Sequence, residues 1–131
     1  MSLDLTTGMT LEAWVYPTAN DQGWRDIIYK GLVDTYYLAG SSGAGAGVPA
    51  IGGTFSDNAL NGSEALPVNT WSHLAGTYDG TRLRLYVNGT QVASQQQTGP
   101  IDTSTGPLTI GGDTFYGQFW QGRIDEVRIY G

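Results

Sequence analysis

The stretch from residue 70 to residue 89 constrains the fold more than any other part of the chain. It reads Thr-Trp-Ser-His-Leu-Ala-Gly-Thr-Tyr-Asp-Gly-Thr-Arg-Leu-Arg-Leu-Tyr-Val-Asn-Gly. Over residues 82–87, leucine and valine alternate with arginine and tyrosine, and this period of two is typical of a strand with one buried face. Asp79-Gly80 and Asn88-Gly89 are dipeptides that accept the positive φ of tight hairpin turns. The stretch therefore predicts an antiparallel meander in the middle of the chain.

Further short strands are predicted on both sides of this meander. They cover residues 9–16, 26–30, 35–39, 48–55, 90–97, 107–111 and 122–130. Pro49 favours an edge position for the strand over 48–55, and residues 57–67 are expected to be a turn-rich connection. No segment has apolar residues at helical spacing, and strands about 8–12 residues apart favour an all-β jelly-roll sandwich of two antiparallel sheets.

The predicted strand over residues 9–16 carries large or apolar side chains on both faces. One face holds leucine, alanine and valine, and the other holds Glu12, Trp14 and Tyr16. We therefore expect an inner strand that is covered on both sides, with Trp14 and also Trp71 in the core.

Composition limits the classes of partner. The 131 residues suit one domain, and the lack of cysteine excludes disulfides and thiolate metal sites. Twelve acidic residues against 6 basic ones give a net charge of -6, which argues against nucleic acid or an anionic membrane as a partner. No stretch approaches the roughly 20 apolar residues of a membrane helix, so no membrane insertion is expected. The first residues show no secretory signal peptide.

Seven short blocks in one order carry a family resemblance. They are Thr10-Leu-Glu-Ala-Trp-Val15, Ile28-Tyr-Lys-Gly31, Asn69-Thr-Trp-Ser-His-Leu-Ala75, Thr77-Tyr-Asp-Gly80, Leu85-Tyr-Val-Asn-Gly89, Leu108-Thr-Ile-Gly-Gly112 and Gly122-Arg-Ile-Asp-Glu-Val-Arg-Ile-Tyr130. Together they resemble the laminin-G-like branch of the concanavalin A-like lectin/glucanase superfamily, over nearly the whole chain. The resemblance implies a single concanavalin A-like domain over residues 1–131. It also implies an extracellular or cell-surface module of the kind found beside the domains of larger bacterial enzymes or adhesins.

The same resemblance points to a difference at the beginning of the chain. Domains of this family usually have a strand before the position of residues 2–5, and this sequence starts just upstream of that position. Loss of that strand would expose unpaired backbone groups at a sheet edge. A tendency to form a homodimer, or a partner segment that covers the edge, is therefore expected.

The resemblance also implies a calcium site. Related jelly rolls hold Ca²⁺ with an aspartate of the last strand, completed by backbone carbonyls and early acidic residues, and such oxygens suit this cation. Asp125 is the first candidate, and Asp4 and Asp26 are weaker ones. Asp125 shares strand parity with Val127 and Ile129, so its carboxylate is expected to face the buried side. The alternative is that Asp125 accepts backbone amides at a strand end.

Catalysis is not expected. Glycosidases need two positioned carboxyl groups, and the glucanase relatives carry Glu-x-Asp-x-x-Glu on one strand. Here the run Ile124-Asp-Glu-Val127 points its two carboxylates to opposite faces. His73, the single histidine, is expected to pack on Trp71, because no nucleophile motif accompanies it.

Aromatic residues in or near loops are the best candidates for a binding site. Sugars stack on aromatic rings and bond to nearby polar groups, which selects Trp24, Arg25, Tyr36, Tyr37, Tyr116 and Trp120. The alternative is that Trp24 and Trp120 cap the ends of the sandwich. The sequence thus predicts a non-catalytic module that binds carbohydrate or a glycoconjugate, with calcium support. A structural, adhesion or protein-interaction module is the second interpretation, and a small glycosidase-like enzyme is the third.

Overall fold

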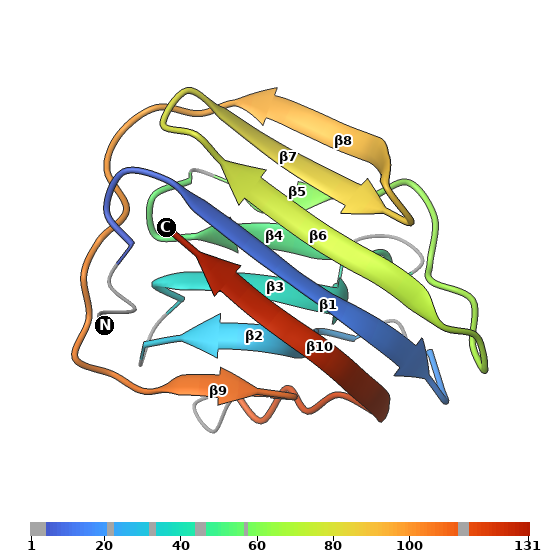
Figure 1. Cartoon of the computed structure of the whole chain (residues 1–131). Helices are drawn as coiled ribbons and strands as arrows, with labels where there is room; N and C mark the ends of the chain where they lie inside the picture. Colours follow the sequence, from blue (N-terminus) through green and yellow to red (C-terminus); the bar gives the residue numbers. More distant parts are fainter. Residues whose placement is uncertain (1–4, 21–22, 32–33, 44–46, 57, 113–115) are drawn as a thin grey trace.

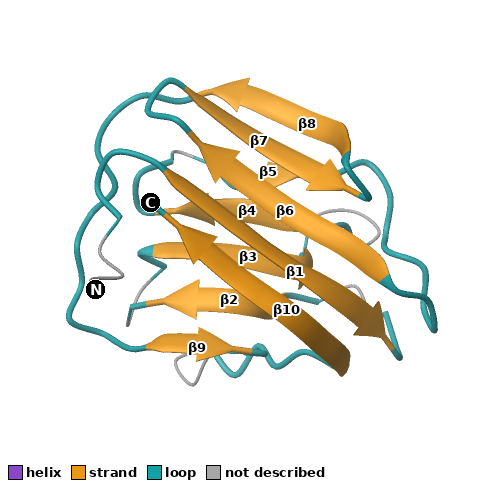
Figure 2. Ribbon diagram, viewed as in Figure 1, coloured by secondary structure: helices purple, strands orange, loops and turns teal. Residues whose placement is uncertain are grey.

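Two five-stranded antiparallel sheets pack face to face in the computed structural model (Figure 1). The structure describes residues 5–20, 23–31, 34–43, 47–56, 58–112 and 116–131. These residues form strands, turns and loops, without a helix (Figure 2). The predicted all-β jelly-roll sandwich is therefore confirmed. Within the described residues, no helix has the length and apolar character that crossing a membrane requires.

Sheet A contains the predicted meander. Its strand order is β10-β1-β6-β7-β8, so β1 lies inside the sheet and β8 and β10 form its edges. The strands are β1 (Met9–Pro17), β6 (Ser72–Tyr78), β7 (Arg82–Val87), β8 (Thr90–Gln96) and β10 (Gly122–Tyr130). The turns after β6 and β7 fall at the predicted dipeptides, with positive φ at Gly80, Asn88 and Gly89.

Sheet B has the order β5-β4-β3-β2-β9. Its strands are β2 (Arg25–Lys30), β3 (Tyr36–Ser41), β4 (Ala50–Gly53), β5 (Leu60–Asn61) and β9 (Leu108–Ile110). The edge position predicted from Pro49 is wrong, because β4 begins after that proline and pairs on both sides. The partner on the outer side is β5, a two-residue strand within a connection that was expected to contain turns only.

The core lies between the two sheets. Alternate residues of β1, such as Leu11, Ala13 and Val15, are fully buried there, and the rings of Phe55 and Tyr78 pack with centroids 4.7 Å apart. Among the described residues, no third layer covers the other face of β1. Trp14 and Trp71 are therefore 39% and 40% exposed on the outer face of sheet A, and their predicted place in the core is wrong.

A bulge in β10 changes the side on which its carboxylates lie. Glu126 has a φ of 50°, and the pairing of β10 with β1 shifts register there. As a result Ile124, Val127 and Ile129 pack against the core, whereas Asp125 is exposed and pairs with Trp14. The predicted burial of Asp125 is therefore wrong. Its carboxylate accepts a hydrogen bond of 2.8 Å from the backbone N–H of Glu126, at the bulge inside β10 and not at the strand end that the alternative interpretation named.

Candidate functional site

A cavity of about 210 Å³ brings together three of the six predicted ligand-binding residues. These are Trp24, which precedes β2, Tyr37 in β3, and Tyr116 in the segment between β9 and β10. The same cavity is lined by Asp26, Asp34 and Gln118. Aromatic rings, carboxylates and an amide from three separate parts of the chain therefore surround one small space, named here the Trp24 cavity.

Tyr37 lines the cavity from the outer face of sheet B. Its neighbours Tyr36 and Leu38 belong to the core, so strand alternation turns Tyr37 away from sheet A. Gly52 pairs with Tyr37 on β4, and a Cβ atom at Gly52 would lie 2.7 Å from the Tyr37 hydroxyl oxygen. The absence of a side chain at Gly52 therefore makes room for the Tyr37 hydroxyl group.

Trp24 is held against Tyr37 by its ring geometry. The two ring centroids are 5.8 Å apart and the ring planes are inclined by 88°, an edge-to-face arrangement that aromatic pairs prefer. On another side of the indole, a Cβ atom at Gly43 would lie 2.9 Å from Trp24 Nε1. The absence of a side chain at Gly43 thus allows Trp24 to lie close to the backbone at this residue.

Hydrogen bonds of their backbone N–H groups hold the two aspartates of the cavity in place. Asp26 is only 1% exposed, and its N–H donates to the carbonyl of Gln118 over 3.1 Å, which ties the segment before β10 to β2. Asp34 adopts a φ of 42°, and its N–H donates to the Tyr29 hydroxyl over 2.8 Å. Burial, and then the negative charges of Asp34 and Asp26, raise the pKa of Tyr37 above its usual range. The cavity therefore combines aromatic surface with a negative potential.

The other three predicted ligand-binding residues do not line this cavity. Tyr36 is fully buried in the core, so its predicted role in surface binding is wrong. Trp120 packs against the core and donates from Nε1 to the Arg123 carbonyl over 3.2 Å, which agrees with the alternative that it caps the sandwich. Arg25 begins β2 and pairs with Ser41.

The structure places two of the three predicted calcium ligands on different sheets. Asp125 is exposed on β10 of sheet A, whereas Asp26 is buried on β2 of sheet B, so these two carboxylates do not form one site. Asp4 lies outside the described residues. In the part of the chain that the structure describes, no three acidic or histidine side chains are grouped as ligands of one ion. Calcium binding by Asp125 or Asp26 stays a prediction.

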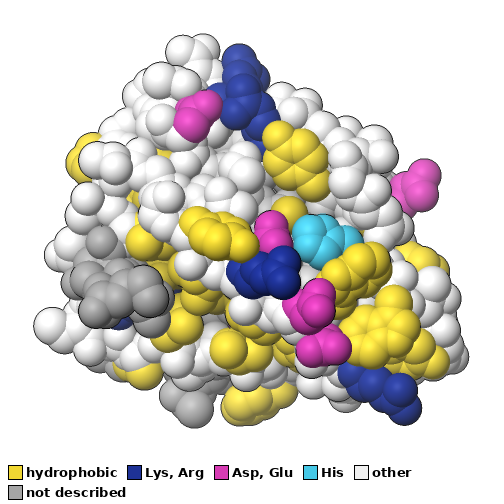
Figure 3. Space-filling model, viewed as in Figure 1, with side chains coloured by type: hydrophobic (Ala, Val, Ile, Leu, Met, Phe, Trp, Pro, Cys, Tyr) yellow, Lys and Arg dark blue, Asp and Glu magenta, His cyan; other side chains and the backbone are white. Residues whose placement is uncertain are grey.

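A second surface of interest lies on the outer face of sheet A. Trp14, Trp71, His73, Asn88 and Gly89 border an open hollow of about 670 Å³. Figure 3 shows this side of the molecule, with hydrophobic side chains around the histidine. We call these five residues the aromatic face of sheet A. Sequence reasoning missed it because the apolar residues on both faces of β1 suggested burial on both.

Ring contacts connect this aromatic face. Trp14 meets His73 with centroids 5.2 Å apart, and Trp71 meets Tyr16 at 5.4 Å. The Arg123 guanidinium carbon lies 5.1 Å from the centre of the Tyr16 ring, within the range of a cation–π contact. The predicted packing of His73 on Trp71 is thus replaced by an edge-to-face contact with Trp14.

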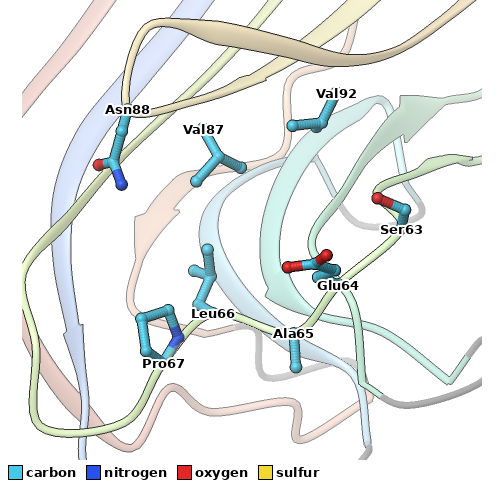
Figure 4. Close-up of a pocket in the computed structure, with 8 residues that line it drawn as sticks. All are labelled: Ser63, Glu64, Ala65, Leu66, Pro67, Val87, Asn88 and Val92. Atoms are coloured by element: carbon cyan, nitrogen blue, oxygen red, sulfur yellow. The ribbon is translucent and has the colours of Figure 1, made fainter.

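A third hollow, of about 320 Å³, lies between residues 63–67 and the turn that joins β7 and β8 (Figure 4). Leu66 and Pro67 line one side of this groove, and Val87 and Asn88 line the other. Its described lining residues include one carboxylate, that of Glu64, and no aromatic ring. It therefore offers no surface on which a sugar could stack.

Comparison with known proteins agrees with the fold. The laminin G family model described as "Concanavalin A-like lectin/glucanases superfamily" matches residues 1–131. Domain 4 of the arabinanase AbnA from Geobacillus stearothermophilus, solved with arabinotriose, is similar with a TM-score of 0.75 and 20% identity. The carbohydrate-binding module CBM40 of a Ruminococcus gnavus sialidase, bound to α2,3-sialyllactose, is similar with a TM-score of 0.76 and 18% identity.

The extent of these similarities differs. Each of the two similarities covers 98% of this chain, together with 62% of the solved chain of arabinanase domain 4 and 77% of the solved chain of the sialidase CBM40 module. Mouse pappalysin-1 is 38% identical over 65 residues, which is 46% of this chain and 4% of pappalysin-1. The chain thus corresponds to a small part of that protein.

Proposed function

Because the chain belongs to the concanavalin A-like lectin/glucanase superfamily, we propose that it is a non-catalytic module that binds carbohydrate or a glycoconjugate. The observation that carries this proposal is the convergence of Trp24, Tyr37 and Tyr116 with two carboxylates and an amide around one cavity. An aromatic ring offers a stacking surface for the apolar side of a sugar ring. The carboxylate and amide oxygens accept hydrogen bonds from its hydroxyl groups, so the cavity has the mixture of apolar and polar groups that ligand sites use.

Similarity to known proteins supports the same class of ligand. Two relatives of this fold were solved with arabinotriose and with sialyllactose, and each was bound by a domain or module of a larger enzyme. By analogy, we propose that this chain serves as a binding module at the cell surface or outside the cell, next to other domains. Calcium support and homodimer formation belong to the same proposal. Calcium would raise the melting temperature relative to chelator, and dimers would appear in sedimentation at high protein concentration.

The proposal excludes catalysis by the carboxylates of β10. Asp125 and Glu126 lie on the bulge and are exposed, and Asp125 is engaged by a backbone amide. Glu12 instead forms an ion pair on the outer face of sheet A, with its Oε1 atom 3.6 Å from Nη1 of Arg128. A polysaccharide hydrolysis assay tests this point. Hydrolysis that is lost in Asp34→Asn or Glu126→Gln would show that the domain is an enzyme.

Calorimetric titration with a panel of oligosaccharides tests the binding function. The matched variants are Trp24→Ala, at the cavity, and Trp71→Ala, on the opposite sheet, each checked for folding by its melting curve. We expect Trp24→Ala to abolish binding and Trp71→Ala to retain it. The reverse result would move the site to the aromatic face of sheet A. If no member of the panel binds the wild-type domain, the carbohydrate function is overturned.

A second candidate function is a protein-interaction module. The observation that favours it is the aromatic face of sheet A, where two tryptophans are about two-fifths exposed beside polar groups. Tryptophan, tyrosine and arginine are enriched among the residues that dominate protein interfaces. Loss of a protein partner in Trp71→Ala but not in Trp24→Ala would favour this function.

A further inference from the structure

We infer that the Trp24 cavity selects a protonated amino group on its ligand, so that an amino sugar with a free amine is preferred over neutral or acidic sugars. The inference rests on the proposed function, and it adds the chemical class of the sugar. It is carried by Asp26 and Asp34, the two carboxylates of the cavity, together with the aromatic rings around them.

The charge of the lining is one-sided. Its described residues include two aspartates and neither lysine nor arginine, and the whole chain carries a net charge of -6. Asp26 is 1% exposed, so water screens its charge less than it would at an open surface. An ammonium group that enters the cavity is attracted by both carboxylates. The carboxylate of a sialic or uronic acid would instead be repelled by them.

Tyr37 reports the electrostatic potential inside the cavity. Burial raises the pKa of its hydroxyl group, and the charges of Asp34 and Asp26 raise it further, because both disfavour the negative phenolate. The phenol therefore stays neutral near neutral pH, and the two carboxylates supply the charge of the described lining. The negative charges of Asp34 and Asp26, which oppose a further anion at Tyr37, attract a cation at the same place.

The rings add a second attraction for a cation. Aromatic faces carry partial negative charge, and tryptophan attracts ammonium groups most strongly among the aromatic residues. Trp24, Tyr37 and Tyr116 make up half of the six lining residues, and Trp24 is held in place by its edge-to-face contact with Tyr37. Aromatic rings together with carboxylates suit an organic ammonium group.

A bare metal ion fits this lining less well. Calcium in proteins generally takes about six to eight oxygen ligands. The cavity offers two carboxylates and one amide, and its other three described lining residues are aromatic. A volume of about 210 Å³ also leaves room for an organic group rather than only an ion. We therefore take the amine as the occupant and calcium as a competing outcome of the test.

The test compares glucosamine, glucose and N-acetylglucosamine, which differ at one position of the ring. Each sugar is titrated calorimetrically at about pH 6, where the free amine of glucosamine is protonated. We expect glucosamine to bind the wild-type domain on the order of tenfold more tightly than the other two, which corresponds to about 1.4 kcal/mol. The preference should disappear at a pH above the pKa of the sugar amine, because the ligand then carries no positive charge.

Asp34→Asn is the diagnostic variant. Asn accepts the positive φ that Asp34 has, and the change removes one charge while it keeps the shape. We expect this variant to lose most of the preference for glucosamine and to melt like the wild type. Asp102→Asn makes the same change in charge at an exposed residue that does not line the cavity, and it should keep the preference.

The outcomes separate this inference from the function on which it rests. Equal or tighter binding of glucose, N-acetylglucosamine or an acidic sugar through Trp24 overturns the amine preference and leaves the carbohydrate function intact. Displacement of glucosamine by calcium that depends on Asp34 would identify a metal site instead. Absence of binding by every sugar overturns both. If Asp34→Asn does not fold, the wild-type comparison and its pH dependence decide the result.

Discussion

The indole ring of Trp24 meets the ring of Tyr37 edge to face, with centroids 5.8 Å apart. Trp24 precedes β2 and Tyr37 lies in β3, so the contact depends on the register of this hairpin, in which Tyr29 pairs with Tyr37. Any change that moves Tyr37 across sheet B will therefore move one wall of the Trp24 cavity. The neighbouring strand β4 offers a way to test this without altering a lining residue.

Gly52→Ala should weaken ligand binding at the Trp24 cavity. The new methyl group would lie 2.7 Å from the Tyr37 hydroxyl oxygen and 3.3 Å from the Ala59 Cα atom, so Tyr37 must shift. We expect a several-fold loss of affinity and a loss of about 1–3 kcal/mol in the free energy of unfolding. Titration and chemical denaturation measure the two effects. Adding Tyr37→Phe, which removes the hydroxyl, should restore part of the stability, and no recovery would contradict the proposed clash.

Asp79 should make the stability of the domain sensitive to acid. Its carboxylate accepts hydrogen bonds from the backbone and hydroxyl groups of Thr81 and from the Arg82 N–H, and it pairs with Arg84 over 3.1 Å. These donors, the Thr81 backbone first, hold the pKa of Asp79 well below its usual range. The ionised group is therefore favoured in the folded state. Its contribution is present above the unfolded pKa of about 3.9 and is lost as the pH falls through the folded pKa.

Melting temperatures measured between neutral and acidic pH test this linkage. The wild type should lose stability more steeply below about pH 4 than Asp79→Asn, which keeps one acceptor oxygen and cannot ionise. Near neutral pH, the wild type should be the more stable of the two. Parallel curves for both proteins would show that Asp79 does not contribute to acid sensitivity.

Gly76→Ala should destabilise the core where the two sheets meet. A Cβ atom at Gly76 of β6 would overlap the Cδ1 atom of Ile51, which is fully buried on β4. We expect a loss of about 1–3 kcal/mol in the free energy of unfolding, measured by urea denaturation. Ile51→Val removes that Cδ1 atom. The double variant should lose less stability than the sum of the losses in Gly76→Ala and Ile51→Val. Simple additivity of the two losses would rule out the overlap with the Ile51 Cδ1 atom as the cause.

The strand pattern was predictable because it follows from local chemistry. Alternation over residues 82–87 and the glycine turns at Gly80 and Gly89 set the meander, and both are confirmed. The place of Trp14 was not predictable in this way. Alternation shows which residues share a face, but it does not show whether a third layer covers that face, and here none covers the outer face of β1 among the described residues.

Glu126 should be replaceable by glycine with a gain in stability. Its φ of 50° is costly for a residue with a side chain, and the residue is exposed on the bulge of β10. We expect Glu126→Gly to raise the free energy of unfolding by about 1 kcal/mol, and Glu126→Val to lower it. Arg128→Gly is the control, because glycine in a regular strand destabilises by about 0.5–1 kcal/mol. Equal effects of the two glycine changes would contradict the bulge.

This bulge also explains why Asp125 was misplaced. Parity counted back from Val127 puts Asp125 on the buried side only if the strand is regular, and the extra residue at Glu126 reverses that count. The residues that line the Trp24 cavity were predictable in part. Their aromatic character and their place beside loops selected Trp24, Tyr37 and Tyr116. The same criteria selected Tyr36, which is buried in the core, because adjacent residues of a strand face opposite sides and Tyr37 takes the outer side.

The Trp24 cavity and the aromatic face of sheet A point away from each other, because they lie on the outer sides of two different sheets. A ligand that occupies one side therefore leaves the other side open. If both surfaces bind as proposed, the domain can hold one molecule at Tyr37 and a different one at Trp14 at the same time. Where these two molecules belong to one larger surface, the second contact forms at a raised effective concentration once the first is made, so two weak contacts can give durable attachment.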